Sequence, residues 1–335
     1  MSDAPGPRSG RARKHPPTRA EFEAGFADIE AQVRARNEKI NARSGRNLGM
    51  AVLVGLALGG GLLASLLIVK ELFMLFAVVL LVVTAFELTT ALRTSGRDVP
   101  RAPIIIAALA AVPGSFYSLD ELTSFFGLPQ PPDVVALERD GLHWLVIFGG
   151  MLLVTLWRLV EQLAPGRRTS ARELGKDLAA GILVMGYVIF LASFAVVLTA
   201  SEGGQFWTLA FLIVVVSTDV GAYASGLRFG KHPMAPNISP KKTWEGFAGA
   251  AVIATIAGIL LAIFMLHQPW WVGVILAVTM LVTAVSGDLA ESLIKRDLGI
   301  KDISSWLPGH GGLLDRLDSI LLSAPVAYAL FLIFT

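Results

Sequence analysis

Nine apolar stretches dominate this chain, and most of them are long enough to cross a lipid bilayer. A helical crossing needs about 20 apolar residues, because the apolar core of a bilayer is about 30 Å thick and a helix rises about 1.5 Å per residue. The 335 residues are 54% hydrophobic and only 16% charged. These features predict an all-α polytopic membrane protein with about nine transmembrane helices. The predicted spans lie near residues 48–69, 72–92, 102–116, 142–160, 178–200, 206–227, 247–266, 270–294 and 317–334.

The third predicted span is the shortest and contains Pro113 and Gly114. Proline removes a helical hydrogen bond, so a kinked or partial crossing is expected there. The chain also lacks cysteine, which excludes disulfides, thiolate nucleophiles and cysteine-bound zinc.

The distribution of basic residues predicts the orientation of the spans. With nine crossings and a cytoplasmic N-terminus, 26 of the 28 Lys and Arg residues fall on the cytoplasmic side, leaving Lys70 and Arg139 outside. Cytoplasmic segments of membrane proteins carry this excess of positive charge. The pattern therefore predicts that the N-terminus and the polar segments described below face the cytoplasm.

Three regions follow from this pattern. Residues 1–47 form a basic tail, in which Phe22, Phe26, Ile29 and Val33 repeat with helical spacing. This spacing predicts an amphipathic helix on the membrane surface or on a partner subunit, with a solvated tail as the alternative. Residues 48–177 are assigned to N-terminal transmembrane helices, and residues 178–335 to a C-terminal transmembrane catalytic region.

A dense polar segment, residues 286–319, lies between two of the apolar stretches. Helical spacing places Asp288, Glu291, Ser292 and Lys295 on one face. Asp288 lies inside an apolar run, where an ionisable group is costly and by default functional. After a helix break at Pro308 and Gly309, Asp315 and Asp318 return at a spacing of three. Carboxylates so spaced can share a hard cation, while Lys295, Arg296, Lys301 and Arg316 can neutralise phosphate.

A second polar segment, residues 217–246, follows the sixth span. Asp219, Tyr223 and Gly226 fall on one helical face, and Asp219 is again inside an apolar run. Beyond them, Ser239, Lys241, Lys242 and Thr243 form a basic loop that opens a new helix, a plausible cradle for a triphosphate. The simplest interpretation is a single site, with Asp219 and Asp288 bridged through a divalent metal to a nucleotide phosphate.

These residues resemble the signature of the CDP-diacylglycerol synthases, also called phosphatidate cytidylyltransferases. The similarity has no departures across residues 292–318, and the second polar segment resembles an upstream motif of the same family. The signature positions are Ser292, Ile294, Lys295, Arg296, Lys301, Asp302, Pro308, His310, Gly311, Gly312, Asp315, Arg316 and Asp318.

The resemblance implies that CTP and phosphatidic acid react to give CDP-diacylglycerol and pyrophosphate. It implies Mg²⁺ as cofactor, with a monovalent cation such as K⁺ as a second candidate. It also implies a homodimer. From the resemblance together with the loop charges, we expect a protein of the cell (inner) membrane with its active site facing the cytoplasm. No nucleic-acid partner is expected.

The resemblance also suggests a role for each candidate residue. Asp219 and Asp288 are expected as metal ligands, with Asp315 and Asp318 as further ligands or supports. Lys241 and Lys242 are expected to hold the terminal phosphates of CTP. Lys295, Arg296 and Arg316 are expected to bind the lipid phosphate or the transferring group. His310 is expected either to donate to a phosphate or to stabilise its turn. The other expected substrate contacts are Tyr223, Ser239, Thr243, Ser292, Gly311 and Gly312.

Two other functions were compared with this one. CDP-alcohol phosphotransferases carry a motif, D-x-x-D-G-x-x-A-R, that is absent here. An ion-coupled transporter would also use carboxylates in the membrane, but transporters often show an internal repeat with matching broken helices, whereas both polar segments belong to the C-terminal half. One further intramembrane carboxylate, Glu87, is expected to pair helices or snorkel rather than to catalyse.

Overall fold

The structure is a computed structural model that describes residues 48–68, 70–125, 127, 139–236, 238–304 and 311–335. The chain divides into two compact units, Met1–Leu53 and Val54–Thr335. The second unit contains nearly all of the described residues and is the one described below. The predicted amphipathic helix of the basic tail lies outside the described residues, as does His310.

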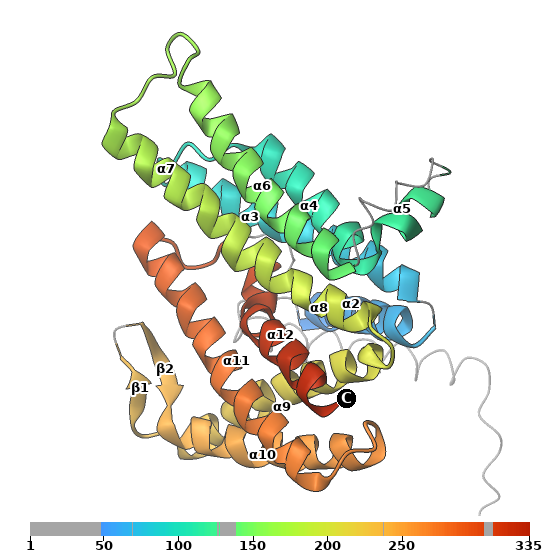
Figure 1. The fold of residues 1–335 in the computed structure, drawn as a ribbon. Coiled ribbons are helices and arrows are strands. Elements are labelled where there is room, and N and C mark those ends of the chain that lie inside the picture. The colour runs from blue at the N-terminus through green and yellow to red at the C-terminus, as the bar shows by residue number, and fades with distance from the viewer. Residues whose placement is uncertain (1–47, 69, 126, 128–138, 237, 305–310) are drawn as a thin grey trace, which may run out of the picture. The chain divides into compact units, whose positions relative to one another are not determined.

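Helices make up most of the described chain (Figure 1). They are α2 (Leu48–Leu67), α3 (Lys70–Thr94), α4 (Arg101–Phe116), α5 (Leu119–Phe125), α6 (Arg139–Glu161), α7 (Ala171–Val184), η2 (Met185–Phe190), α8 (Leu191–Ala200), α9 (Gly204–Phe229), α10 (Trp244–Phe264), α11 (Trp270–Leu298) and α12 (Leu314–Phe334). A hairpin of two antiparallel strands, β1 (Pro233–Ala235) and β2 (Ser239–Thr243), precedes α10.

All nine predicted spans coincide with helices, and the polytopic all-α membrane class is confirmed. Within the described residues, seven helices are long and apolar enough to cross a membrane, or eight if a bent pair counts as one span. The bent pair is α4 and α5, which meet at 107°. The bend follows Phe116, since α4 continues through Pro113. Because α2 is not among these seven or eight helices, the count of nine stays a prediction.

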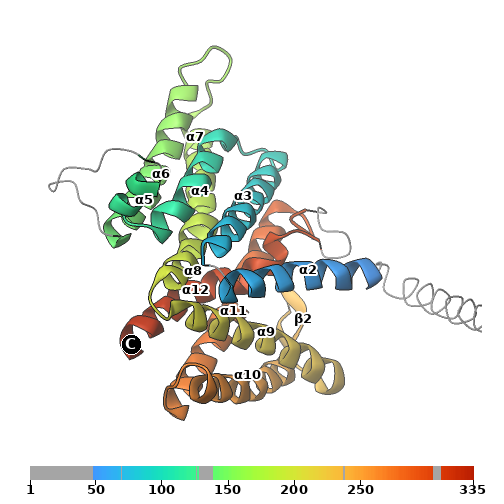
Figure 2. The same cartoon turned by 90° about the vertical axis from the view of Figure 1, so that its right-hand side faces the viewer.

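Two groups of helices are joined by one long composite helix. The first group contains α3, α4 and α6, and the second contains α9, α10, α11 and α12. The continuous run α7–η2–α8 contacts both groups (Figure 2). Its middle part, η2, is a π-helix of six residues, a local irregularity that the sequence did not predict. π-Helical insertions are rare and frequently occur near functional sites.

Small residues explain why α10 packs closely against its neighbours. Every fourth residue along its buried face is glycine or alanine, and this stripe consists of Gly246, Ala250, Ala254, Gly258 and Ala262. A β-carbon added to Gly258 would lie only 2.4 Å from the Gly273 carbonyl oxygen of α11. In lipid, where apolar burial contributes little to helix association, such stripes let backbones approach and gain packing energy.

A buried ion pair holds the first helix group to the composite helix. The Arg158 side chain of α6 is fully buried and donates to Asp177 Oδ2 of α7 at 2.7 Å. The other oxygen, Asp177 Oδ1, accepts the Asp98 backbone amide at 3.0 Å. A buried pair of this kind is costly to break, because removal of one partner leaves an uncompensated charge.

We therefore expect Arg158→Met to lower the free energy of unfolding by about 3–5 kcal/mol, because it leaves the Asp177 carboxylate buried without its guanidinium partner. Thermal unfolding of the detergent-solubilised protein would measure the loss. Lys176→Gln is the matched control: it breaks an exposed pair with Glu173 on the same helix, and such pairs contribute about 0–1 kcal/mol. If Arg158→Met were as stable as Lys176→Gln, the Arg158–Asp177 pair would not be buried as the structure shows.

Candidate active site

The two polar segments predicted from the sequence meet around one cavity of about 430 Å³. We call it the carboxylate cavity. Residues from α9, β1, β2, α10, α11 and α12 line it. They include ten of the candidate residues, namely Asp219, Tyr223, Ser239, Lys241, Lys242, Thr243, Asp288, Asp315, Arg316 and Asp318. The prediction that both segments form a single site is thus matched by their placement in space.

A glycine allows the carboxylates of α11 and α12 to come together. A β-carbon on Gly287 would lie 2.3 Å from the Asp318 carbonyl oxygen, so only glycine permits this separation of the two backbones. Asp288 follows directly, and Tyr187 of η2 donates its hydroxyl to the Gly287 carbonyl at 3.4 Å. The crossing of α11 and α12 therefore lies at the level of the cavity.

Four carboxylates line the cavity, and the charges of three of them interact. Asp219 and Asp288 influence each other electrostatically, and both act on Asp318. Asp219 lies on the open side, whereas Asp318 is buried. Lys242 Nζ of β2 lies 2.6 Å from Asp288 Oδ2, and the Ser292 hydroxyl donates to Asp288 Oδ1 at 3.3 Å. Lys241 and Arg316 also line the cavity, so its four carboxylates face three cationic side chains.

A second cavity of about 580 Å³ adjoins the first. We call it the basic cavity, because four cationic side chains and no acidic one line it among the described residues. Its lining is Ile238, Ser239, Pro240, Lys241, Ser292, Lys295, Arg296, Gly299, Ile300 and Lys301. Ser239 and Lys241 line both cavities. Strand β2 thus forms a shared wall between a carboxylate-rich space and a cationic one.

Lys295 connects the basic cavity to the start of α12. Its ammonium group lies 2.6 Å from Glu291 Oε2 and 2.8 Å from Asp315 Oδ1. The other oxygen, Asp315 Oδ2, accepts the Gly312 amide at 2.8 Å and the Ile303 amide at 3.3 Å. Asp315 is therefore engaged on both oxygens, which favours a supporting role for it over direct ligation. Glu291, almost fully buried, joins the site as a partner of Lys295.

Two glycines of the signature segment shape the backbone, and Arg296 of the basic cavity also contacts it. Gly311 adopts a positive φ of 82°, which side chains rarely tolerate. A β-carbon on Gly312 would lie 2.9 Å from Asp315 Oδ2. Both glycines therefore allow the chain to turn closely around Asp315 as it enters α12. Arg296 donates from Nε to the Ile238 carbonyl at 3.4 Å, which connects α11 to the hairpin.

The four predicted metal ligands do not form a preorganised metal centre. Over the part of the chain that the structure describes, no group of three or more acidic or histidine side chains is placed to hold a metal ion. Their chemistry nevertheless fits Mg²⁺, which proteins usually bind through one or two carboxylates together with substrate phosphates. The assignment of Asp219, Asp288, Asp315 and Asp318 as ligands stays a prediction.

Sequence reasoning gave Glu87 no part in the site, but the structure places it at the edge. Its carboxylate, from α3, accepts the Leu314 amide at 3.0 Å and also the hydroxyl of Ser304. These contacts span more than 200 residues of sequence. The only sequence signal was a carboxylate in an apolar segment, which cannot indicate where its partner lies.

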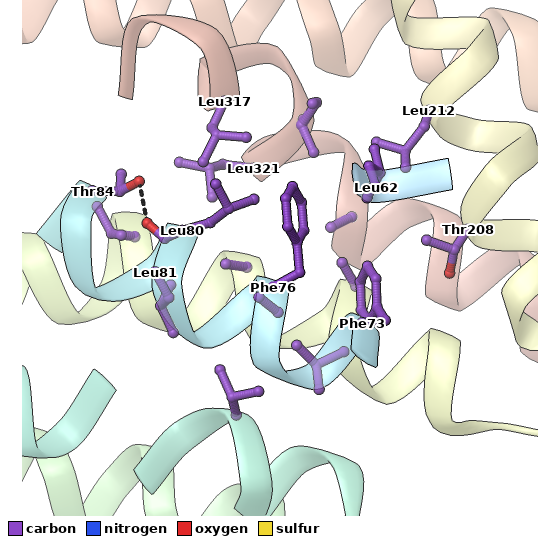
Figure 3. Close-up of a pocket in the computed structure, with 18 of the residues that line it drawn as sticks. Leu62, Phe73, Phe76, Leu80, Leu81, Thr84, Thr208, Leu212, Leu317 and Leu321 are labelled. Carbon is purple, nitrogen blue, oxygen red and sulfur yellow. Dashed lines mark hydrogen bonds between the residues drawn. The ribbon is translucent and has the colours of Figure 1, made fainter. Parts of the chain in front are cut away.

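A third cavity, of about 100 Å³, lies on the opposite face of α12 (Figure 3). Its lining is apolar apart from two threonines, and Thr84 donates its hydroxyl to the Leu80 carbonyl at 2.7 Å. Leu317 and Leu321 face it, while Asp315 and Asp318 face the carboxylate cavity. A lining without free polar groups offers no chemistry, so α12 separates the candidate site from an apolar interior.

Comparison with known proteins agrees with this site. Residues 50–334 match the model of the cytidylyltransferase family. The chain is 40% identical over 293 residues to a phosphatidate cytidylyltransferase of Mycobacterium bovis, covering 86% of this chain and 89% of that protein. A Mycobacterium leprae phosphatidate cytidylyltransferase is 36% identical over 304 residues, covering 88% and 91%. One from Brucella suis is 36% identical over 201 residues, covering 58% and 73%.

The chain therefore belongs to the cytidylyltransferase family. The family resemblance inferred from the signature residues is confirmed. Both polar segments and both lined cavities fall within the matched residues.

The close approach at Gly287 gives a test of this geometry. We expect Gly287→Ala to destabilise the protein by about 1–3 kcal/mol, because the added methyl group must push α11 and α12 apart. Gly175→Ala is the matched control, since a β-carbon there meets nothing within 4 Å and alanine favours the helix by about 0.5–1 kcal/mol. Thermal unfolding in detergent would compare them. A Gly287→Ala variant as stable as the wild type would show that the helices are further apart.

Proposed function

We propose that this protein transfers the cytidylyl group of CTP to phosphatidic acid, giving CDP-diacylglycerol and pyrophosphate. The observation that carries the proposal is the pair of adjoining cavities, one rich in carboxylates and one cationic, that share Ser239 and Lys241. Residues of the family signature line both cavities: Asp315, Arg316 and Asp318 in the first, and Ser292, Lys295, Arg296 and Lys301 in the second. The names of the mycobacterial relatives support the same reaction.

The reaction is a displacement at phosphorus. An oxygen of the phosphatidate phosphate forms a bond to the α-phosphorus of CTP, while the bond from that phosphorus to the bridging α–β oxygen breaks. The electron pair leaves with pyrophosphate. The attacking phosphate is already ionised at neutral pH, so the protein needs to position the groups and neutralise their charge rather than supply a strong base.

The charges of the two cavities suggest where each substrate binds. The triphosphate carries the larger negative charge and fits the basic cavity, where Lys241, Lys295, Arg296 and Lys301 gather. The lipid phosphate would then bind beside Arg316 in the carboxylate cavity, whose lining also includes apolar Phe247 and Val285. The sequence suggested Lys295 and Arg296 for the lipid phosphate or the transferring group, and this arrangement assigns them to the triphosphate of the nucleotide instead.

The shared wall would hold the reacting phosphorus. Lys241 and Ser239 line both cavities, so a phosphate between them is within reach of either substrate. Lys242 is tied to Asp288 at 2.6 Å and would orient that carboxylate. Bound Mg²⁺, held by Asp219, Asp288 and Asp318 together with substrate phosphates, would supply further charge neutralisation. A monovalent cation such as K⁺ is a second proposed cofactor.

The position of the protein in the cell is part of the proposal. Nine spans and a cytoplasmic N-terminus would put both cavities on the cytoplasmic side of the cell (inner) membrane, where CTP is available. The charge distribution of the loops supports this orientation. The phosphatidate acyl chains would enter sideways from the inner leaflet, which fits a site at the ends of helices. The homodimer likewise stays a prediction.

The proposal is tested by pyrophosphate release from purified protein in detergent. We expect release only when CTP, phosphatidic acid and Mg²⁺ are all present. Asp288→Asn should lower turnover at least 100-fold without unfolding, because it removes a charge from the centre of the carboxylate cavity. Asp297→Asn, an exposed aspartate on the same helix, is the control. Release without phosphatidic acid, or full activity of Asp288→Asn, would refute the proposal.

The assignment of the triphosphate to the basic cavity has its own test. Lys301→Gln is expected to raise the KM for CTP about 3- to 10-fold and to leave the KM for phosphatidic acid unchanged, since it removes one of four cations from that cavity. Lys231→Gln, in the loop before the hairpin, should change neither constant. An increase confined to the KM for phosphatidic acid would assign the cavity to the lipid instead.

A further inference from the structure

The beginning of α12 has an unusual capping arrangement. The residue at the N-cap position is Leu313, which has no side-chain acceptor. Helix N-termini leave amide groups without partners inside the helix, and in a buried position each needs an acceptor. Leu314 is fully buried, so water is not available to satisfy its amide. The acceptor comes instead from Glu87, on a helix of the other group.

Glu87 contacts two positions within the segment that carries the family signature. Its Oε2 accepts the Leu314 amide at 3.0 Å, where α12 begins. Its Oε1 accepts the hydroxyl of Ser304, which precedes α12 in the same segment. The carboxylate is only 2% exposed. A negative charge is also favourable at a helix N-terminus, where the amide dipoles point toward it.

The position at which α12 begins determines where its first-turn residues lie relative to both cavities. Asp315, the next residue, binds Lys295 at 2.8 Å, and the ammonium group of Lys295 lines the basic cavity. Asp318 follows one turn later in the carboxylate cavity. The orientation of an ammonium group in one cavity and of a carboxylate in the other therefore depends on where the helix starts.

We propose that Glu87 is a positioning residue for the transfer reaction: it caps α12 from a distant helix and so fixes Asp315, Lys295 and Asp318 in the arrangement that turnover requires. Glu87 does not line either cavity, so it acts through these residues and not on the substrates. The inference rests on the proposed function for its kinetic consequence, but the capping contact itself does not depend on that function.

The experiment compares Glu87→Gln, Glu87→Ala and Ser304→Ala with Glu71→Gln as the matched control. Glu71 is an exposed carboxylate near the start of the same helix. We expect kcat to fall about 10-fold or more in Glu87→Gln and further in Glu87→Ala, with less loss in Ser304→Ala, which keeps the helix cap. The KM values for both substrates should change less than kcat, because Glu87 itself lines neither cavity.

Two readouts separate positioning from a simple loss of folded protein. The fraction of each preparation that binds CTP measures the folded enzyme, and kcat is expressed per binding site. Hydrogen exchange of a peptide covering residues 311–317 reports the cap directly. We expect exchange to be about 10-fold faster in Glu87→Ala than in Glu71→Gln, with Glu87→Gln between them, since it keeps one carbonyl acceptor.

The outcomes distinguish the inference from the proposed function. Equal kcat per binding site in Glu87→Gln and Glu71→Gln, or unchanged exchange in Glu87→Ala, would overturn the positioning role. A decrease in activity that only follows the amount of CTP-binding protein would overturn it as well. If the wild type released no pyrophosphate, the proposed function would fail, while the exchange measurement would still decide whether Glu87 caps α12.

Discussion

The constraint on which this structure depends is the gathering of carboxylates where apolar helices converge. Asp219, Asp288, Asp315 and Asp318 share one cavity, and Glu291 lies close by as a partner of Lys295. Like charges in a medium of low dielectric repel strongly, so each needs a counter-charge or several hydrogen-bond donors. The structure supplies Lys242 for Asp288, Lys295 for Glu291 and Asp315, and backbone amides for Asp315. These ionic contacts tie the hairpin to α11 and α11 to α12.

The lysines in these ionic contacts can also interact with a phosphate group. Lys242 and Lys295 are partly exposed, at 22% and 17%, so an anion entering either cavity can share an ammonium group with the carboxylate already bound to it. Such sharing costs little, because the group is positioned before the anion arrives. Asp288 therefore holds the Lys242 ammonium group in position before substrate binds, and Glu291 and Asp315 do the same for Lys295. Charge neutralisation that is organised in advance is what a displacement between two anionic phosphates requires.

Much of the helical fold, and much of the site, could be predicted because their signals are local. Apolar length predicted the helices, and helical spacing placed Asp288 and Lys295 on one face before any contact was known. The sequence predicts a loop at Ser239–Thr243, where the structure has strand β2, since five residues containing proline give little strand signal. The π-helix and the contacts of Glu87 could not be predicted at all. Their causes are packing and a partner more than 200 residues away.

Glu87 also shows why sequence motifs alone cannot tell which half of the chain contributes to the site. The signature residues all lie in the C-terminal half, and a motif search would treat the earlier helices as a membrane anchor. Yet the buried start of α12 has no acceptor within its own first residues for the Leu314 amide, and α3 supplies one. The composite helix α7–η2–α8 contacts both helix groups, and Tyr187 in its π-helix contacts Gly287 at the crossing of α11 and α12. The Leu314 amide must be satisfied where water is excluded, and α3 supplies its acceptor. The N-terminal helices are therefore part of the scaffold of the site, although none of their described residues lines the carboxylate or basic cavity.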